Sequence, residues 1–465
     1  MTRNVSLRAC FSLLTGCFLT VPQAWAARPQ PDLEAGKAAY GQYCARCHGD
    51  AGKGDGVDSK RFYPRPRDLT LGKYKFRTTA TGTVPTDEDL FHTLTYGLPG
   101  SNMPDWQFLD ESIRWQLVEY LKSLSSVFQE SPPGALSIPL DPGPKHADLS
   151  KGREVYEKLG CAACHGTKGR ANGTSAAGLE DEWGMRIRPA NLTQGWAYRG
   201  GSAAKDIVTR VLAGIDGANM PSYDGAITPP ENVWQLAYYV ESLQEKPHWN
   251  MIVHALKVDG ELPEQSNDPR WQDAESTTLR IRNVVTREGE WQHPPTVRAL
   301  VLQVAYNDEA VAFRIAWDDP SQETEGIPDA LAILLKPQAI RGDVVTLQAW
   351  PYQGAPRLDA TYWAANSPRA AAVLIENFEP LTPDAAAKGS LPANAAYEDG
   401  RWSLVVRHPL KPAVADGAAI QRDDFTAVAF AVWDAGNANA RAVSPWFDLM
   451  LKRPADEPAH AGKHE

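Results

Sequence analysis

The chain has 465 residues, of which 43% are hydrophobic and 22% are charged, and its formal net charge is −10. A chain of this length is expected to hold roughly three domains of about 150 residues each, and its composition is that of a globular protein. The acidic balance argues against a nucleic-acid-binding protein, because such proteins present a basic surface.

The N-terminal residues have the features of a secretory signal peptide. Arg3 and Arg8 precede or begin an apolar stretch, and Ala24–Ala26 has small residues at the two positions that a signal peptidase recognises. We therefore expect residues 1–26 to be removed and the mature protein to be periplasmic. Lipid attachment at Cys17 is the alternative, but the residues after it stay apolar. No later segment approaches the ~20 apolar residues of a membrane span, so no transmembrane segment is expected after signal removal.

Four cysteines remain after this leader, and all of them lie in two Cys-x-x-Cys-His motifs. The motifs consist of Cys44, Cys47 and His48, and of Cys161, Cys164 and His165. Two thiols on one helical turn can form thioether bonds with the two vinyl groups of a haem, and the histidine that follows can ligate the iron. A thioredoxin-like redox pair or a zinc site shared by both pairs would leave the two histidines unexplained. The sequence therefore predicts two covalently bound haems c.

The second axial ligand of each iron is predicted from the few methionines. Met103 and Met220 each precede a proline in a glycine-rich loop, and each lies 55 residues after its motif histidine. A loop offers a methionine little core to fill, so we expect both to ligate iron. Met185 follows its histidine by only 20 residues, and we assign it to packing. An iron with histidine and methionine ligands has a raised reduction potential and is closed to substrates.

An internal repeat accompanies the two motifs. Apolar residues recur at helical spacing, which predicts one helix before each motif and one tryptophan-led helix after each methionine. The predicted helices are 34–40 and 115–124 in the first copy, and 151–156 and 234–243 in the second.

Prolines and arginines lie between the histidine and the methionine of each copy. The prolines are expected to form one wall of each haem site; they are Pro64, Pro66 and Pro189. A guanidinium pairs well with a carboxylate, so three arginines are candidates for the haem propionates, with a solvated surface as the equal alternative. They are Arg65, Arg67 and Arg188.

Residues 31–127 and 147–246 each resemble a class I cytochrome c domain. In both, a helix, Cys-x-x-Cys-His, a Met-Pro loop and a terminal aromatic helix follow one another. The resemblance implies two all-α domains with one covalent haem each. The predicted domains are 27–127 and 147–246, and the proline-rich linker 128–146 between them is expected to be a semi-extended spacer.

From about residue 248 the apolar pattern changes to a period of two, which predicts β-strands. The predicted strands are 297–305, 311–317, 331–335, 344–350, 402–407, 425–433 and 446–451. The first two are expected to form a hairpin. We predict one all-β sandwich over residues 250–453 and a flexible tail over 454–465, which makes the whole chain a multidomain protein with two all-α domains and one all-β domain.

Several strings in this region resemble the haem-binding domain of the ethylbenzene dehydrogenase gamma subunit. They are FRIAWDDPS (313–321), PDALAILL (328–335), VVTLQAWPYQ (344–353), WSLVVRHPL (402–410) and AVAFAVWDAG (427–436). That family includes small subunits of periplasmic molybdenum enzymes of the DMSO reductase class. The resemblance implies a sandwich that holds a non-covalent haem b between a methionine and a lysine and relays electrons.

The sequence departs from that family at both haem ligands. Residues 339–343 contain no methionine where the family has one, and Arg441 stands where the lysine is expected. Arginine stays protonated and cannot offer a lone pair to iron. Replacement ligands would have to be sought among Met251, His254, Lys336 and His408, each of which is better read as an ordinary strand or edge residue. A third, non-covalent haem b is therefore not favoured, and a sandwich without it would be a docking or folding module.

Together these features predict an exported dihaem c-type cytochrome that transfers single electrons between redox partners. The β-sandwich would dock or relay to a partner oxidoreductase, and the candidate partners are a periplasmic molybdenum oxidoreductase or another cytochrome. The alternative is a haem enzyme, peroxidase-like or acting on sulfur compounds, in which one axial ligand exchanges. No Ser-His-Asp or paired-carboxylate arrangement stands out, so no catalytic residue is predicted and the carrier is preferred.

Overall fold

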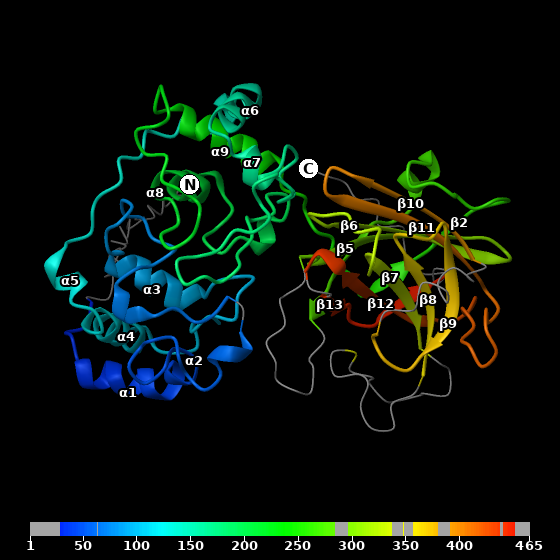
Figure 1. The fold of residues 1–465 in the computed structure, drawn as a ribbon, viewed down its shortest axis with the longest axis horizontal. Coiled ribbons are helices and arrows are strands. Elements are labelled where there is room, and N and C mark those ends of the chain that lie inside the picture. The colour runs from blue at the N-terminus through cyan, green and yellow to red at the C-terminus, as the bar shows by residue number, and fades with distance from the viewer. Residues whose placement is uncertain are drawn as a thin grey trace, which may run out of the picture.

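The computed structural model describes residues 28–62, 64–283, 296–336, 347, 357–379, 391–437 and 440–451. In this part of the chain, helices form one lobe and strands form a second lobe beside it (Figure 1). Three regions of interest fall outside it: the expected signal peptide with Cys17, residues 339–343, and the tail 454–465. The predicted strand 344–350 also lies outside, apart from Leu347.

The first helical unit contains α1 (Leu33–Tyr43), α2 (Ala45–His48), α3 (Asp87–Tyr96), α4 (Glu111–Ser123) and α5 (Val127–Glu130). Asp32 caps α1 by accepting a hydrogen bond from the backbone of Ala35, as short polar N-cap side chains do. Helix α1 crosses α4 closely at Gly36, where an added Cβ atom would lie 2.3 Å from the carbonyl oxygen of Gln116. Only a glycine allows this approach of the two backbones.

The second helical unit repeats this arrangement with α6 (Leu149–Lys158), α7 (Ala162–His165), α8 (Ala204–Ala213) and α9 (Asn232–Ser242). Gly152 in α6 meets Gln235 in α9, and an added Cβ atom would lie 2.1 Å from the carbonyl oxygen of Gln235. The four helices predicted by apolar spacing are confirmed as α1, α4, α6 and α9. Helices α3 and α8 were not predicted, although Thr86 and Asp89 form a capping box at the start of α3.

The linker between the helical units is attached to the second unit rather than free. Trp234 donates its indole hydrogen bond to the carbonyl of Pro139 at 2.8 Å, and Tyr238 donates to the carboxylate of Asp141 at 2.7 Å. A short helix, α5, overlaps the start of the predicted linker. The proline-rich stretch therefore runs along α9, which differs from the expected spacer because aromatic side chains of α9 hold it.

The C-terminal half is a sheet-rich, barrel-like domain, called here the β-domain, in which fourteen strands are described. Their bounds are β1 (Ile252–His254), β2 (Leu256–Lys257), β3 (Thr277–Arg280), β4 (Arg282–Asn283), β5 (Ala299–Tyr306), β6 (Ala310–Asp318), β7 (Ala330–Leu335), β8 (Leu358–Ala364), β9 (Arg369–Ile375), β10 (Leu391–Glu398), β11 (Arg401–Pro409), β12 (Thr426–Asp434), β13 (Ala440–Val443) and β14 (Phe447–Met450).

The strands follow one another in the order β1-β14-β12-β7-β8-β9-β10-β11-β6-β5-β2, so the sheet turns back on itself through β10. Strand β10 pairs with β9 at Leu391 and Pro392 and with β11 from Ala393 onward. The predicted hairpin is confirmed as β5 and β6. The enclosed core contains apolar side chains from both runs of strands, among them Leu302, Phe313, Ile333, Trp402 and Phe430.

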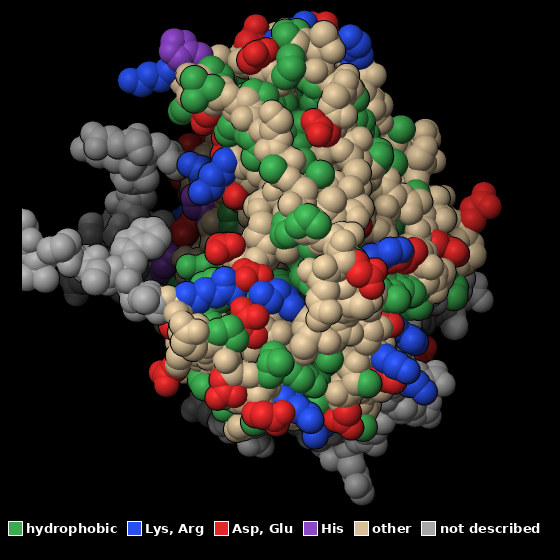
Figure 2. Space-filling model, turned by 90° about the vertical axis from the view of Figure 1, so that its left-hand side faces the viewer, with side chains coloured by type: hydrophobic (Ala, Val, Ile, Leu, Met, Phe, Trp, Pro, Cys, Tyr) green, Lys and Arg blue, Asp and Glu red, His purple; other side chains and the backbone are tan. Residues whose placement is uncertain are grey.

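No helix among the described residues is long and apolar enough to cross a membrane. Figure 2 shows the helical lobe from the side that faces away from the β-domain; acidic and basic side chains are intermixed over it, with apolar side chains between them.

Candidate functional site

Each motif histidine is held by a hydrogen bond on one side of its ring. His48 Nδ1 lies 3.0 Å from the carbonyl oxygen of Arg67, and His165 Nδ1 lies 2.9 Å from that of Ala190. A carbonyl oxygen only accepts, so Nδ1 carries the proton in both rings and Nε2 presents its lone pair. Burial lowers the pKa of both histidines, which keeps them neutral. Both rings are therefore oriented and prepared to ligate a metal through Nε2.

A buried tyrosine fixes the turn that follows each motif. Tyr40 donates a hydrogen bond to the carbonyl of Gly49 at 2.8 Å, and Tyr156 donates to that of Gly166 at 2.7 Å. Both glycines have a positive φ, 79° and 80°, a conformation that other residues adopt at a cost. The chain can therefore leave the motif helix sharply while the histidine ring stays in place.

The second unit contains a cavity of about 350 Å³ that brings its four predicted site residues together. Cys161, Cys164, His165 and Met220 all line it. The lining also includes the apolar side chains of Leu192, Ile207, Val211 and Leu236. Two thiols, an imidazole and a thioether on an apolar cavity form the donor set that a covalently attached haem requires.

Basic side chains surround this cavity, as a haem with two propionates requires. Lys75, Arg170, Arg186, Arg188, Arg199, Arg210 and Arg298 line it. Burial lowers the pKa of Lys75 to about 8 and that of Arg210 to about 10, because a buried cation loses its hydration. Two carboxylates in the cavity would favour the charged forms of both. Arg188, a candidate for a haem propionate or for a solvated surface, thus lines this cavity.

In the first unit, Cys44 and Met103 belong to or pack against one cluster of apolar side chains. Cys44 is buried in this cluster and Met103 packs against it. Cys47 is half-buried. The Met103 loop is closed by a hydrogen bond from the backbone of Leu98 to the carbonyl of Met103 at 3.0 Å. The Cys-x-x-Cys-His turn and the methionine loop therefore face one apolar region.

Two of the buried donors in the first unit that lack an acceptor in the described part of the chain lie beside its apolar cluster. The hydroxyl of Tyr74 and the indole Nε1 of Trp106 have no hydrogen-bond partner, and both side chains pack against the cluster that includes Cys44. A buried donor without an acceptor costs free energy, and a haem propionate would supply acceptors for both. These donors fit a bound haem, and sequence reasoning missed them because neither lies in a motif.

Residues 64–77 of the first unit, called here the crossing segment, contact both candidate sites. The carbonyl of Arg67 holds the ring of His48, while Pro64, Lys75 and Phe76 line the cavity of the second unit. We expected Pro64 to form a wall of the first haem site, but the structure places it at the second, because the crossing segment passes from one unit to the other. The two sites are neighbours across a single short segment.

Ion pairs fasten the crossing segment to the second unit. Arg67 lies 3.7 Å from Glu182 and Lys75 lies 3.7 Å from Asp181. The guanidinium of Arg77 is fully buried and lies 2.9 Å from Asp216, and it also donates to the carbonyl of Ala213 at 3.2 Å. A buried pair of this kind is strongly sensitive to removal of one partner, so the two units are held in one arrangement.

The β-domain closes the other side of the second cavity. Thr296, Arg298, Asp318 and Pro320 belong to it and line the cavity. The carboxylate of Asp318 lies 3.3 Å from Nε of Arg170 and accepts a hydrogen bond from Asn191 at 2.9 Å. Sequence reasoning missed these wall residues, since they stand more than a hundred positions from the second motif.

The proposed replacement ligands for a third haem are spread over different strands. Met251 directly precedes β1 and His254 ends it, whereas His408 lies in β11 and donates a hydrogen bond from Nδ1 to the carbonyl of Pro409 at 2.6 Å. Lys336 directly follows β7. Arg441, which stands at the family's lysine position, forms an ion pair with Glu379 at 2.7 Å.

Comparisons with known proteins agree with the geometry of the helical units. Residues 31–121 and 147–240 match the family described as Cytochrome C oxidase, cbb3-type, subunit III. A Cbb3-type cytochrome c oxidase subunit CcoP of Azospirillum sp. (strain B510) is 26% identical over 219 residues, which cover 45% of this chain and 62% of the relative. The subunit FixP of Azorhizobium caulinodans is 27% identical over 213 residues, or 45% of this chain and 58% of the relative. The chain thus spans about three fifths of these relatives.

Solved structures give two further similarities. The Kuenenia stuttgartiensis reducing HAO-like protein complex Kustc0457/Kustc0458 has a chain that is 40% identical, with a TM-score of 0.43, covering 47% of this chain and 100% of that one. A carbohydrate binding module family 9 from Caldicellulosiruptor kristjanssonii is 11% identical, with a TM-score of 0.28, covering 45% and 99%. From the family match, the N-terminal half of the chain contains cytochrome c domains, which bind haem c covalently.

Proposed function

We propose that this protein is an exported dihaem c-type cytochrome that passes single electrons between redox partners. Each helical unit would hold one haem c. In the first, Cys44 and Cys47 would form the thioether bonds, and His48 and Met103 would be the axial ligands. In the second, the corresponding residues are Cys161, Cys164, His165 and Met220. The bound haems would supply one-electron chemistry, while the chain sets their orientation, burial and reduction potential.

The observation that carries this proposal is the crossing segment, residues 64–77. It holds the His48 ring through the carbonyl of Arg67 and lines the second cavity with Pro64, Lys75 and Phe76. An electron that enters at one site therefore has a second acceptor on the other side of one segment. A buried ion pair between Arg77 and Asp216 keeps this geometry fixed without any need for movement.

The presence of Met220 in the second cavity favours a carrier over the alternative haem enzyme. Met220 and His165 both line the cavity, and residues of all three domains contribute walls. An iron with both axial positions filled does not bind a substrate. Electron transfer needs only proximity of the haem edges, so burial of this kind is compatible with a carrier.

The β-domain is proposed to dock the cytochrome units to a partner oxidoreductase or to relay electrons to it. Its contacts with the second unit support this, because Asp318 joins it to Arg170 and Asn191 beside the cavity. The resemblance to the ethylbenzene dehydrogenase gamma subunit suggests a periplasmic molybdenum oxidoreductase as one partner class, and another cytochrome is the second. The predicted signal peptide, residues 1–26, agrees with a periplasmic location.

The proposal is tested by haem content and ligation in the mature protein produced in a host that attaches haem c. A pyridine haemochrome spectrum should give two haems c per chain and no haem b. Met103→Ala and Met220→Ala should each lower one of two reduction potentials and remove part of the methionine-to-iron charge-transfer band. Met185→Ala is the matched control and should leave both unchanged.

Two results would contradict the proposal. One haem c per chain would show that one motif serves another purpose. A wild-type ferric spectrum with a high-spin fraction, together with turnover of peroxide or a sulfur compound, would instead support the enzyme alternative. One haem b per chain in the pyridine haemochrome spectrum would instead support a third, non-covalent haem in the β-domain and a role for that domain in electron relay.

A further inference from the structure

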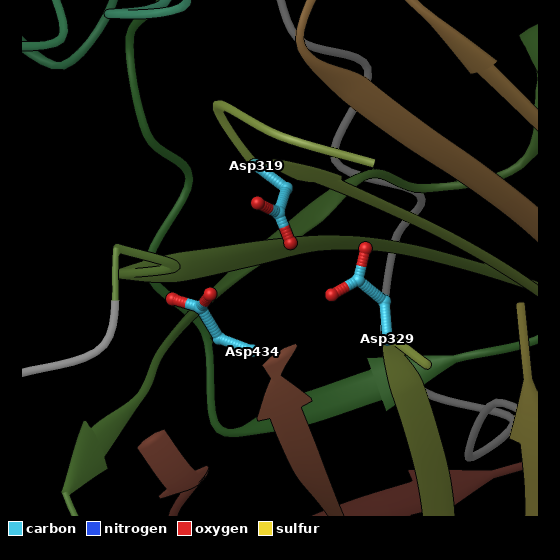
Figure 3. Close-up of side chains that lie close together, drawn as sticks. All are labelled: Asp319, Asp329 and Asp434. Carbon is cyan, nitrogen blue, oxygen red and sulfur yellow. The ribbon is translucent and has the colours of Figure 1, made fainter. Parts of the chain in front are cut away.

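Three aspartates of the β-domain meet at one buried point. Asp319 follows β6, Asp329 precedes β7 and Asp434 ends β12. Their exposed fractions are 0%, 1% and 1%, and one carboxylate oxygen of each lies within 4.8 Å of the others. Figure 3 shows the three carboxylates close together, each coming from a different segment of the β-domain. The fold therefore gathers three acidic groups from positions up to 115 residues apart.

Two of the carboxylate oxygens in this cluster have no hydrogen-bond partner among the residues that the structure describes. They are Oδ2 of Asp319 and Oδ1 of Asp434. The opposite oxygens are satisfied: Asp319 Oδ1 accepts from the backbone of Ser321 at 3.3 Å, and Asp434 Oδ2 accepts from the backbone of Thr296 at 2.8 Å. A fully buried carboxylate oxygen without a donor is costly. These unpartnered oxygens indicate that a positively charged group belongs beside them.

The third carboxylate is oriented by fixed donors. Asp329 accepts hydrogen bonds from the backbone of Glu323 at 3.0 Å, the backbone of Ala435 at 3.1 Å and the indole Nε1 of Trp402 at 3.2 Å. Donors of this kind hold a carboxylate in place and leave its remaining lone pairs for a ligand. The cluster is thus built rather than accidental, because its members are held from several strands.

The charge of the cluster needs compensation. Burial raises the pKa of all three carboxyl groups, that of Asp329 to about 7, and the neighbouring carboxylate of Glu323 raises them further, while the guanidinium of Arg188 lowers that of Asp434. Either protons or a cation can neutralise such a group. Protonated carboxyl groups would need acceptors for their O–H donors, whereas a cation satisfies several oxygens together.

We propose that Asp319, Asp329 and Asp434 bind one Ca²⁺ ion that ties the ends of β6, β7 and β12 together. Calcium takes oxygen ligands at 2.3–2.6 Å, so an ion at the centre reaches oxygens up to roughly 5 Å apart. Magnesium usually retains several water molecules, which a site this deeply buried does not favour. Two further oxygen-bearing side chains, Ser321 and Glu323, lie beside Gly436, two residues after Asp434. An added Cβ atom at Gly436 would lie 2.2 Å from the Ser321 hydroxyl oxygen and 2.6 Å from a Glu323 carboxylate oxygen. These side chains can complete the ligand set.

The site also adjoins the cavity of the second helical unit. Thr296 donates its backbone hydrogen bond to Asp434 and lines that cavity. Pro320 lines it too and directly follows Asp319. A bound Ca²⁺ would therefore hold part of the cavity wall. The proposal does not depend on the electron-carrier function, because it rests on carboxylates of the β-domain alone.

The test uses the full-length holoprotein, treated with a chelator, desalted and titrated with Ca²⁺ in a calorimeter. We expect one Ca²⁺ per chain, retained through gel filtration and counted by elemental analysis, and a higher unfolding temperature with Ca²⁺ than without it. Asp319→Asn and Asp434→Asn should weaken Ca²⁺ binding by more than the roughly 10–100-fold that loss of an outer-shell partner costs.

Asp359→Asn is the matched control. Asp359 is a fully buried carboxylate on β8 that accepts a hydrogen bond from the backbone of Ala418 at 2.7 Å, and it lies outside the cluster. This variant should bind Ca²⁺ as the wild type does. The proposal is overturned if the chelated wild type takes up no Ca²⁺ and its unfolding temperature does not respond, or if Asp359→Asn loses Ca²⁺ as the cluster variants do. The wild-type measurement decides the matter even if a cluster variant fails to fold.

Discussion

The first and second helical units repeat the same hydrogen bonds around their motif histidines, yet different parts of the chain enclose their sites. His48 and His165 both donate from Nδ1 to a backbone carbonyl, and Tyr40 and Tyr156 both donate to the carbonyl of the glycine after the motif. Residues of the first unit and the β-domain wall the second cavity. Local structure around each motif thus orients the candidate ligand histidine, whereas tertiary structure decides how a site is shielded.

This difference predicts unequal electrostatics at the two sites. Seven basic residues line the second cavity, drawn from all three parts of the chain, whereas the unpartnered donors that pack against the apolar cluster of the first unit are the neutral groups of Tyr74 and Trp106. Cations beside a haem favour its reduced, less positive form. The second site is therefore expected to have the higher reduction potential of the two.

The largest effect is expected from breaking the connection between the units at Arg77. Its guanidinium is fully buried and pairs with Asp216 at 2.9 Å. Arg77→Leu leaves that carboxylate without its partner, and removal of one member of a buried pair costs about 3–5 kcal/mol. Scanning calorimetry of the holoprotein should show the helical transition at lower temperature. Arg153→Leu breaks an exposed ion pair with Glu157 on α6 and should leave the transition temperature unchanged. Equal shifts in the two variants would refute a stabilising role for the buried pair of Arg77.

The next effect concerns the crossing of the helices in each unit. An added Cβ atom at Gly152 would lie 2.1 Å from the Gln235 carbonyl, and one at Gly36 would lie 2.3 Å from the Gln116 carbonyl. Overpacking of this kind costs about 1–3 kcal/mol, so Gly152→Ala and Gly36→Ala should each destabilise their own unit. Denaturant unfolding followed at the haem absorbance measures this.

Gly41→Ala provides the control for both glycine variants. Gly41 lies in α1, and an added Cβ atom there meets nothing within 4 Å. Alanine favours a helix over glycine by about 1 kcal/mol, so this variant should stabilise the first unit. A loss of stability at Gly41 comparable with that at Gly36 would mean that helix crossing is not the cause.

Much of the repeat could be predicted from the sequence, because thiol, imidazole and thioether spacing is local. The same holds for α1, α4, α6 and α9, whose apolar residues recur at helical spacing. The crossing segment could not be predicted: nothing in the order of residues says that Pro64 leaves its own unit and lines the other cavity. Asp318 was missed for the same reason, since its partners Arg170 and Asn191 lie in another domain.

Asp318 offers a way to separate the two sites. It accepts hydrogen bonds from Asn191 at 2.9 Å and Thr193 at 3.0 Å and lies 3.3 Å from Arg170. Asp318→Asn removes a buried negative charge from the wall of the second cavity and weakens contacts worth about 1–3 kcal/mol. The higher of the two reduction potentials should rise, because less negative charge remains beside it, while the lower one stays unchanged. A redox titration that moved both potentials equally would contradict the assignment of this wall to the second site alone.

The smallest effect is expected where the two units are most alike. Tyr40 and Tyr156 are each 1% exposed and donate to the carbonyls of Gly49 and Gly166 at 2.8 Å and 2.7 Å. A hydrogen bond of this kind contributes about 0.5–1.5 kcal/mol, so Tyr40→Phe and Tyr156→Phe should destabilise their units by similar amounts and leave both haems bound. Denaturant unfolding resolved by unit tests this, with Tyr239→Phe as a control on a half-buried ring. If only one variant lowered the stability of its unit, the turn after the motif would not be held in the same way in both units. The difference between the two units would then begin at the motif itself, and not only in the residues that enclose each site.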